Sequence, residues 1–268
     1  MKILAHVHLY YYDQAELLMR RLVESIGSRP RDIYVTMRDE DAGAIAAVKK
    51  YAPDAIILKV KNVGADVWPF IYVLGRVDLS EYDYIVKIHS KRFITEYYEM
   101  PSGFRMHGWR WRDMLISFLR PRKFDNIMTA FAKDEKLGMV GDTRCILTAT
   151  TDCTWHANPG ELLERLGYKK TAEPLPWIGG TMFVARAHVM RPLLNLGISE
   201  KDFETFQSGK SGKMEHRLET LMGNIVACQG YKVADVYNGR LVIFLAAICN
   251  WLWHKIIYNL FIKHFLVQ

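Results

Sequence analysis

Residues 82–92 read Tyr-Asp-Tyr-Ile-Val-Lys-Ile-His-Ser-Lys-Arg, an apolar run that ends in a basic cluster. The run over residues 82–88 is short and rich in β-branched and aromatic residues, which is typical of a strand. The cluster over residues 87–92 then lies at the carboxyl end of that strand. Ligands of open α/β sheets bind beyond the carboxyl ends of the strands, so this stretch predicts both a sheet and the place of a site.

Further apolar runs lie on both sides of this stretch and alternate with helical periodicity. The other expected strands are residues 4–9, 32–37, 55–60, 137–141, 181–185 and 231–236. The expected helices are residues 13–26, 39–51, 108–119, 124–132 and 213–229. Short strands separated by helices predict βαβ units and a mostly parallel sheet. Because the sequence has no internal repeat and no linker rich in Gly, Ser or Pro, we expect one α/β domain over residues 1–240.

The composition is that of a folded globular chain. Half of its 268 residues are hydrophobic and 24% are charged, which excludes an intrinsically disordered protein. Its 18 Gly and 9 Pro exclude a collagen-like or low-complexity architecture. The 36 Lys and Arg against 29 Asp and Glu leave a net charge of +7, which suits a nucleic acid, a membrane surface or an anionic small ligand as partner.

Two features indicate a cytoplasmic protein. Residues 1–8 lack the long apolar region and the cleavage site of a signal peptide. The four cysteines form no Cys-x-x-Cys motif and are expected to be reduced thiols; they are Cys145, Cys153, Cys228 and Cys249.

Residues 241–266 differ from the rest of the chain in being almost continuously apolar and aromatic. Asn250, His254, Lys255 and Lys263 interrupt the run, so no uncharged stretch reaches the roughly 18 residues of a membrane-spanning helix. Its Trp, Tyr and Lys side chains are typical of helices that lie in a membrane surface. We expect an apolar helical extension over residues 241–268 that either lies on a membrane surface or packs on its own domain or a second subunit.

Two polar stretches follow predicted strands. After the third strand, Asn62 and Gly64 tolerate a left-handed backbone, and Asp66 can accept hydrogen bonds from a ribose or a base. The alternative is a turn with a helix cap at Asp66. After the fourth strand, three cations around His89 make an anion site suited to a diphosphate, where His89 donates to phosphate or ligates a metal. The alternative there is a solvated basic loop.

Two later stretches suit an acceptor and a general base. Gly179 and Gly180 precede an apolar strand and let a bulky ligand reach the backbone, while Trp177 offers a flat face to a sugar. The alternative is a glycine-rich turn into a core strand. Glu215 opens a helix, where the dipole favours the ionised form that a general base requires. The alternative is ordinary capping of a surface helix.

The remaining candidates are weaker. His6 and His8 alternate on one strand face, where they line the end of the sheet or lie in the core. Asp142 follows another predicted strand. The chain has no P-loop, HExxH, GxSxG or GxGxxG motif.

Five motifs occur in a fixed order along the chain. They are His6-Val7-His8-Leu9-Tyr10-Tyr11, Asn62-Val63-Gly64-x-Asp66-x-x-Pro69-Phe70, Lys87-x-His89-Ser90-Lys91, Gly179-Gly180-Thr181-Met182-Phe183 and Glu215-His216. Together they resemble the rhamnan synthesis protein F family of bacterial polysaccharide glycosyltransferases over about residues 1–240.

The resemblance implies a GT-A-like, Rossmann-type domain in which a mostly parallel sheet is flanked by helices. It implies a nucleotide-sugar donor, with dTDP-rhamnose favoured, and a growing cell-surface polysaccharide or lipid-linked glycan as acceptor. Two departures from the expected pattern leave questions open. His89-Ser90-Lys91 stands where the GT-A metal motif Asp-x-Asp would end the fourth strand, so no metal ligand is assigned and a need for Mg²⁺ or Mn²⁺ stays open. Ala65 stands where an arginine is expected, which leaves the identity of the donor open.

The resemblance also implies roles for individual residues. Glu215 would deprotonate the acceptor hydroxyl in an inverting displacement, with His216 as its orienting partner or as an alternative base. The donor would be bound by His8, Asn62, Gly64, Asp66, Lys87, His89 and Lys91. The acceptor side would be shaped by Trp177, Gly179, Gly180 and Thr181.

In the cell, we expect such an enzyme to be a peripheral protein on the inner face of a bacterial cytoplasmic membrane, with no nucleic-acid partner. A second hypothesis is a non-catalytic basic binding module for RNA or an anionic membrane. A third, a phosphoester hydrolase, ranks last because the chain lacks the carboxylate cluster that a two-metal site needs.

Overall fold

The computed structural model describes residues 1–268 except 93–96, 100–104, 152–157, 204–213 and 253–268. Its centre is a seven-stranded sheet. The strands are β1 (Ile3–Leu9), β2 (Arg31–Met37), β3 (Ile56–Lys59), β4 (Tyr84–His89), β7 (Leu137–Val140), β10 (Phe183–Arg186) and β11 (Lys232–Ala234). They lie in the order β11-β7-β10-β4-β1-β2-β3. Each strand falls within or overlaps a stretch that the sequence predicts as a strand.

The sheet is mixed but mostly parallel. β1 runs parallel to β2 and β4, β2 to β3, and β7 to β11, whereas β10 is antiparallel to both of its neighbours. The carboxyl ends of β1, β3 and β4 therefore meet at one edge of the sheet. The arrangement confirms the α/β class expected from the sequence, a mostly parallel sheet flanked by helices.

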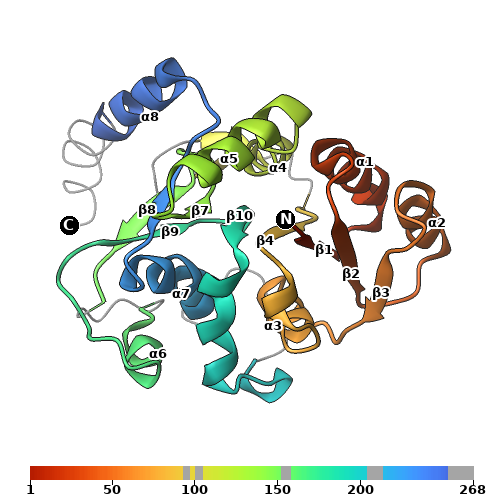
Figure 1. The fold of residues 1–268 in the computed structure, drawn as a ribbon, viewed down its shortest axis with the longest axis horizontal. Coiled ribbons are helices and arrows are strands. Elements are labelled where there is room, and N and C mark those ends of the chain that lie inside the picture. Colours follow the sequence, from red (N-terminus) through yellow and green to blue (C-terminus); the bar gives the residue numbers. More distant parts are fainter. Residues whose placement is uncertain (93–96, 100–104, 152–157, 204–213, 253–268) are drawn as a thin grey trace, which may run out of the picture.

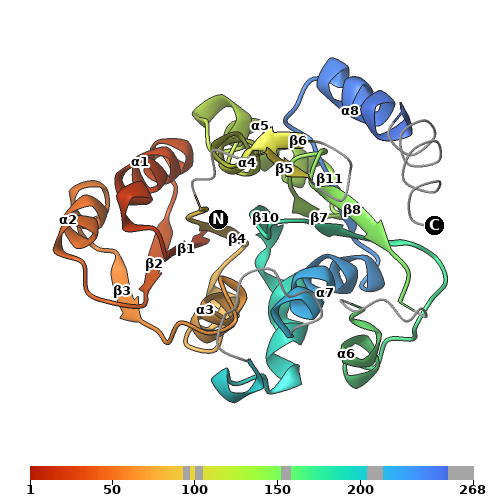
Figure 2. The same cartoon turned by 180° about the vertical axis from the view of Figure 1, so that it is seen from behind.

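Helices cover both faces of the sheet (Figures 1 and 2). One layer holds α1 (Ala15–Ile26), α2 (Ala42–Tyr51), α4 (Gly108–Leu115) and α5 (Pro121–Lys133). The other layer holds α3 (Val67–Leu74), α6 (Gly160–Arg165), the 3₁₀ segment Ala187–Leu196 and α7 (Met214–Cys228). α1 shows why these segments pack: Leu18, Leu22 and Ile26 share one face and are fully buried.

Two short antiparallel pairs supplement the main sheet. β8 (Ile146–Ala149) pairs with β9 (Leu175–Ile178), and β5 (Tyr97–Glu99) pairs with β6 (Arg105–His107). β9 packs along α7 and carries the chain into the Gly179–Gly180 turn. The sequence did not indicate this β8–β9 pair, because its partners are separated by a helix.

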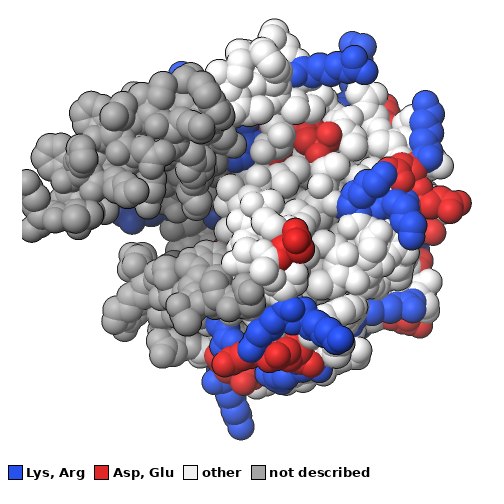
Figure 3. Space-filling view, turned by 90° about the vertical axis from the view of Figure 1, so that its left-hand side faces the viewer, with Lys and Arg blue, Asp and Glu red and all other residues white. Residues whose placement is uncertain are grey.

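α8 (Arg240–Leu252) follows the last strand and lies apart from the two helical layers (Figure 1). Its first apolar side chains are open to solvent, with exposed fractions of 67% for Leu241, 37% for Val242, 36% for Ile243, 61% for Phe244 and 49% for Leu245. The face of the molecule that carries α8 is mostly uncharged across its middle (Figure 3). No helix in the described part of the chain is both long and apolar enough to cross a membrane. The expected extension over residues 241–268 is described only as far as Leu252.

Candidate functional site

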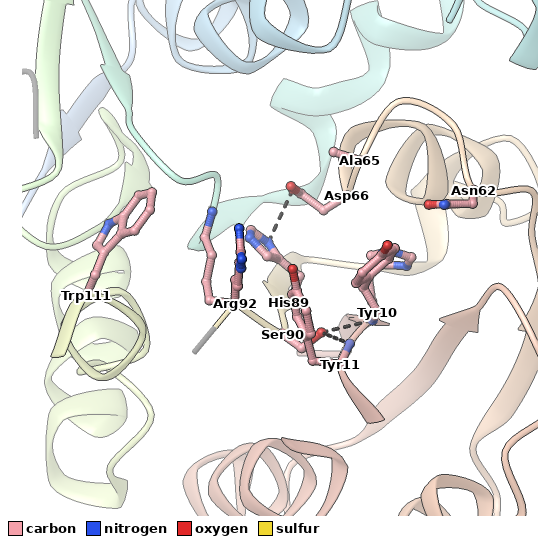
Figure 4. Close-up of a pocket in the computed structure, with 11 residues that line it drawn as sticks. Tyr10, Tyr11, Asn62, Ala65, Asp66, His89, Ser90, Arg92 and Trp111 are labelled. Carbon is pink, nitrogen blue, oxygen red and sulfur yellow. Dashed lines mark hydrogen bonds and ion pairs between the residues drawn. The ribbon is translucent and has the colours of Figure 1, made fainter. Parts of the chain in front are cut away.

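A pocket of about 520 Å³ opens at the carboxyl ends of the central strands. Its walls come from the segments that follow β1, β3 and β4, and from α4, whose Trp111 faces the other residues across the pocket (Figure 4). The lining residues are His8, Tyr10, Tyr11, Asn62, Ala65, Asp66, His89, Ser90, Lys91, Arg92 and Trp111. Stretches far apart in sequence converge here because the parallel strands that carry them end at the same edge.

Lys87 lies behind the pocket and holds Asp66 in place. Its ammonium is fully buried and donates to the Asp66 carboxylate, to the Thr181 carbonyl at 3.0 Å and to the Thr181 hydroxyl at 2.8 Å. The Thr181 hydroxyl in turn donates to Asp66. Burial opposes ionisation of Asp66, yet the ammonium groups of Lys87 and Lys91 hold its pKa well below the usual value. Lys87 is therefore the counter-ion of Asp66 and does not line the pocket.

The backbone is strained on both sides of Asp66. Ala65 has a φ of +50° and Thr181 a φ of +48°, and each directly follows a glycine that is also left-handed. A left-handed conformation is uncommon for a residue with a side chain and is an outlier for a β-branched one. Strain of this kind persists where the surroundings impose it and is concentrated at functional sites.

His89 presents unsatisfied nitrogens to the pocket. It is 3% exposed, its Nδ1 lies 3.2 Å from Asp66 Oδ2, and neither ring nitrogen has a hydrogen-bond partner among the described residues. Burial lowers the pKa of His89 well below its ordinary value, so the ring is neutral near pH 7. Buried polar atoms are normally paired, so an oxygen of a bound ligand is the expected partner.

His6 and His8 share one partner. His6 Nε2 lies 2.9 Å and His8 Nδ1 3.0 Å from the Thr36 hydroxyl oxygen. Burial lowers the pKa of His8 to about 4. His8 lines the pocket, whereas His6 is fully buried against Phe70. Of the two positions expected from the sequence, His8 thus lies at the end of the sheet and His6 lies in the core.

The segment after β4 is tied to its neighbours at several points. Ser90 Oγ accepts the N–H groups of Tyr10 and Tyr11, both at 2.9 Å (Figure 4). The Gln14 side chain donates to the Lys91 carbonyl at 2.5 Å and accepts the Lys91 N–H at 3.1 Å. The Lys91 ammonium lies 4.4 Å from the centre of the Trp111 ring. Lys91 and Arg92 are the cations of the pocket lining, and such groups neutralise phosphate charge.

Gly64 directly precedes the pocket residue Ala65 and lies against an aromatic ring. It has a φ of +62°, and a Cβ there would lie 2.5 Å from the Phe203 ring. Phe203 also packs on Trp68, with ring centres 5.8 Å apart. Gly64 therefore accommodates Phe203, a residue that the sequence analysis did not single out.

The predicted acceptor residues lie where α7 meets β9. Trp177 is only 8% exposed and α7 approaches it closely at Gly223, so its indole is buried and offers no open stacking face. The Gly180 N–H donates to Glu219 Oε1 at 2.6 Å, and Thr181 continues into the contacts with Lys87 and Asp66. The residues predicted for the acceptor side are thus joined to those predicted for the donor at Thr181. Sequence reasoning assigned no role to Glu219, because only its contact with Gly180 distinguishes it.

Glu215 occupies the first turn of α7, four residues before Glu219. It is 3% exposed, and neither carboxylate oxygen has a hydrogen-bond partner among the described residues. His216 Nδ1 is also unpaired within the described ranges. Neither residue belongs to the pocket lining.

Asp142 belongs to a separate, saturated network. It accepts from the Arg144 guanidinium at 2.7 Å through both oxygens, and from Ser117 and Asn238. Asn238 also binds Asp235 and Lys123. Asp142 therefore fixes the chain just before α8 and offers no free oxygen to a ligand.

The described side chains at the end of β4 do not suit a divalent metal as ligands. Asp66 is already bound by Lys87 and Thr181, and the motif position holds His89-Ser90-Lys91. Across the described residues, no group of three or more His, Cys, Asp and Glu side chains could hold a metal ion.

A comparison with protein-family models identifies the family of the chain. The family model described as rhamnan synthesis protein F matches residues 1–231. Two proteins named "Uncharacterized protein WxcX", from two strains of Xanthomonas campestris pv. campestris, are 26% identical over 232 residues. These matches cover 86% of this chain and 32% of the relatives, so the chain spans about a third of their length.

Two solved structures are similar at low scores. Staphylococcus aureus TarS, residues 1–349, has a TM-score of 0.41 and 10% identity over 93% of this chain and 65% of its own. The mannosyltransferase PcManGT from Pyrobaculum calidifontis, solved with GDP-Man and Mn²⁺, has a TM-score of 0.38 and 11% identity over 89% of this chain and 57% of its own. These likenesses are too low to assign a ligand to this chain.

Proposed function

Because the chain belongs to the rhamnan synthesis protein F family, we propose that it is a glycosyltransferase that uses a nucleotide-activated sugar to build a cell-surface polysaccharide or a lipid-linked glycan. The observation that carries the proposal is the pocket at the carboxyl ends of β1, β3 and β4, where cations, an unsatisfied histidine and aromatic rings meet. Polar groups that converge in a partly apolar cleft are typical of small-ligand sites.

In the proposed complex, the nucleoside lies near Asn62 and Asp66, and the diphosphate near His89, Lys91 and Arg92. Asp66 is ionised and can accept a ribose or base donor. Lys91 and Arg92 neutralise the charge that develops on the leaving diphosphate, an electrostatic contribution to catalysis. We take dTDP-rhamnose as the first donor to test, since the family name points to rhamnose.

The transfer is proposed to be a single inverting displacement. The acceptor hydroxyl oxygen attacks the anomeric carbon, and the bond to the diphosphate breaks with its electron pair leaving on the nucleotide. Glu215 takes the hydroxyl proton, with His216 beside it. A buried carboxylate without hydrogen-bond partners is costly to fold, which favours a functional reason for it.

We further propose that α8 holds the enzyme on the inner face of a bacterial cytoplasmic membrane, near a lipid-linked acceptor. The support is its run of exposed apolar side chains next to the basic Arg240. An apolar helix with basic residues can bind at a lipid surface without spanning it.

Thermal-shift assays with dTDP-, UDP- and GDP-sugars, each with and without Mn²⁺, test the proposal. A donor at 100 times its Kd adds about 2.7 kcal/mol of stability, so one nucleotide class should raise the Tm selectively. Glu215→Gln should bind that donor and transfer no sugar; turnover by this variant would remove Glu215 from the mechanism. If no nucleotide sugar binds and RNA binds with steep salt dependence, the chain is a basic binding module instead.

A further inference from the structure

Glu219 joins the two halves of the site, and neither the motifs nor the pocket lining assigns it a role. It lies on the second turn of α7, and its Oε1 accepts the Gly180 N–H at 2.6 Å. The two groups are 39 residues apart in sequence. Gly180 is buried, so loss of this acceptor would leave its N–H unsatisfied, and the contact can therefore hold a turn in an unfavourable conformation.

The turn held by Glu219 is the strained one. Gly180 has a φ of +84°, a conformation that residues with a side chain rarely adopt, and it packs against the end of the Leu115 side chain. Thr181 follows with its own left-handed φ of +48°. From this position its carbonyl and hydroxyl both bind the Lys87 ammonium, which in turn binds Asp66.

The contacts therefore form one connected series from α7 to the pocket: Glu219, Gly180, Thr181, Lys87 and Asp66. Only Asp66 of this series reaches the pocket lining. The charges alternate as well, because Glu219 and Asp66 both lie within electrostatic reach of Lys87.

We propose that Glu219 is a positioning residue: by holding the Gly180 N–H it fixes the turn that carries Thr181, and through Thr181 and Lys87 it sets the orientation of Asp66 toward the donor. The inference rests on the proposed function, because it concerns the binding of that donor. Glu219 acts through the turn and does not touch the reacting atoms.

Three substitutions of Glu219 separate its hydrogen bond from its charge. Glu219→Ala removes the acceptor, Glu219→Gln keeps an oxygen that can accept the Gly180 N–H, and Glu219→Asp keeps the charge on a side chain one methylene shorter. Glu161→Ala is the matched control. Glu161 of α6 also contacts α7, where it pairs with Arg217, but its side chain is 74% exposed. Each variant is titrated calorimetrically with dTDP, UDP and GDP, and KM and kcat are measured with the corresponding sugar nucleotide.

We expect Glu219→Ala to weaken binding of the preferred nucleotide about tenfold or more, because the buried Gly180 N–H is left without its acceptor, and to raise the donor KM more than it lowers kcat. Glu219→Gln should stay within about threefold of the wild type, because the bond to Gly180 survives. Glu161→Ala should match the wild type. If Glu219→Ala does not fold, as judged by its Tm, the test rests on Glu219→Asp. We expect its loss of nucleotide affinity to lie between those of Glu219→Gln and Glu219→Ala.

A Glu219→Ala protein that folds and binds the nucleotide as tightly as the wild type overturns the inference. Equal losses in Glu219→Gln and Glu219→Ala also overturn it, because the charge and not the held turn would then matter. If the wild type itself binds none of the three nucleotides, the proposed function fails, which is a separate outcome.

Discussion

Lys87 and Lys61 each pair with a carboxylate, but in opposite surroundings. Lys87 and Asp66 have side-chain exposures of 0% and 14%, whereas Lys61 and Glu200 have 71% and 39%. In water, the attraction of a pair barely exceeds the cost of ordering it. In the interior, removing one partner leaves the other charge buried without compensation. The two lysines are therefore a matched test of what burial adds to one contact.

Lys87→Met should lower the free energy of unfolding by about 3–5 kcal/mol and abolish nucleotide binding, since Asp66 loses its counter-ion. Lys61→Met should cost about 1 kcal/mol or less. Urea denaturation of the three proteins measures both values. Similar losses in the two variants would show that Lys87 does not serve as the counter-ion of Asp66.

The buried histidines make stability depend on pH. Burial lowers the pKa of His8 from 6.5 to about 4 and shifts those of His6 and His89 in the same direction. Between these values the unfolded chain binds protons that the native chain does not, so the free energy of unfolding should fall as the pH is lowered from about 6.5 to 4. Each such histidine contributes a slope of about 1.4 kcal/mol per pH unit.

His8→Gln should reduce the pH dependence of the free energy of unfolding by the contribution of one histidine. Asp66 also binds a proton more readily in the unfolded chain near pH 4, but both proteins contain it, so its contribution cancels in the comparison. Urea titrations at several pH values between 4 and 7 give the slopes. An unchanged slope in His8→Gln would mean that His8 keeps its ordinary pKa in the native protein.

The site residues that sequence could indicate are those whose chemistry stands next to a strand end. Asp66, His89 and Lys91 follow predicted strands, and all three line the pocket. Gln14, Phe203 and Glu219 could not be found this way. Their roles are contacts across long separations, such as the 77 residues between Gln14 and Lys91, and no local pattern records them.

At the scale of elements, the turn between β3 and α3 depends on what packs over it. Gly64 and Gly167 both have a left-handed φ, of +62° and +82°. A Cβ on Gly64 would meet the Phe203 ring, whereas a Cβ on Gly167 would have no atom within 4 Å. Alanine substitutions at these two glycines therefore separate two contributions to the loss of stability, that of backbone conformation and that of steric overlap.

Gly167→Ala should lower stability by about 1–2 kcal/mol, the cost of a left-handed alanine. Gly64→Ala should cost about 2–4 kcal/mol, because displacement of Phe203 adds to that term. It should also weaken nucleotide binding, since Asp66 lies two residues further along. Thermal unfolding and calorimetric titration provide the two readouts, and equal stability losses would contradict the role given to Phe203.

The strands were predictable because each is a short apolar run with its own local pattern. The antiparallel direction of β10 could not be predicted, since side chains alternate with the same period of two residues in parallel and antiparallel strands. The β8–β9 pair was also missed, because pairing between segments 25 or more residues apart depends on where the intervening chain goes.

For the whole molecule, the exposed apolar residues of α8 provide a test of the proposed membrane contact. Leu241→Ser combined with Phe244→Ser should reduce co-sedimentation of the chain with vesicles of phosphatidylglycerol and phosphatidylethanolamine several-fold, because two of its most exposed apolar side chains are lost. Leu194→Ser is the matched control, since Leu194 is 37% exposed on another part of the surface. Binding that is equal in all three proteins would place the contact elsewhere, and a concentration-dependent dimer lost in the double variant would identify a second subunit as the partner.

The position of β10 between β4 and β7 has a consequence for the chain while it is being made. The first four strands, β1 to β4, follow one another in sequence and can pair as soon as they leave the ribosome. The strand that completes β4 arrives much later, because Thr181 is 94 residues beyond Lys87. At about 5–20 residues per second, the edge of β4 stays open for roughly 5–20 seconds. During translation, then, the half-built sheet exposes β4 as an unpaired apolar strand in which Lys87 has its counter-ion Asp66 but neither of its contacts with Thr181, and this is the interval in which chaperone binding matters most.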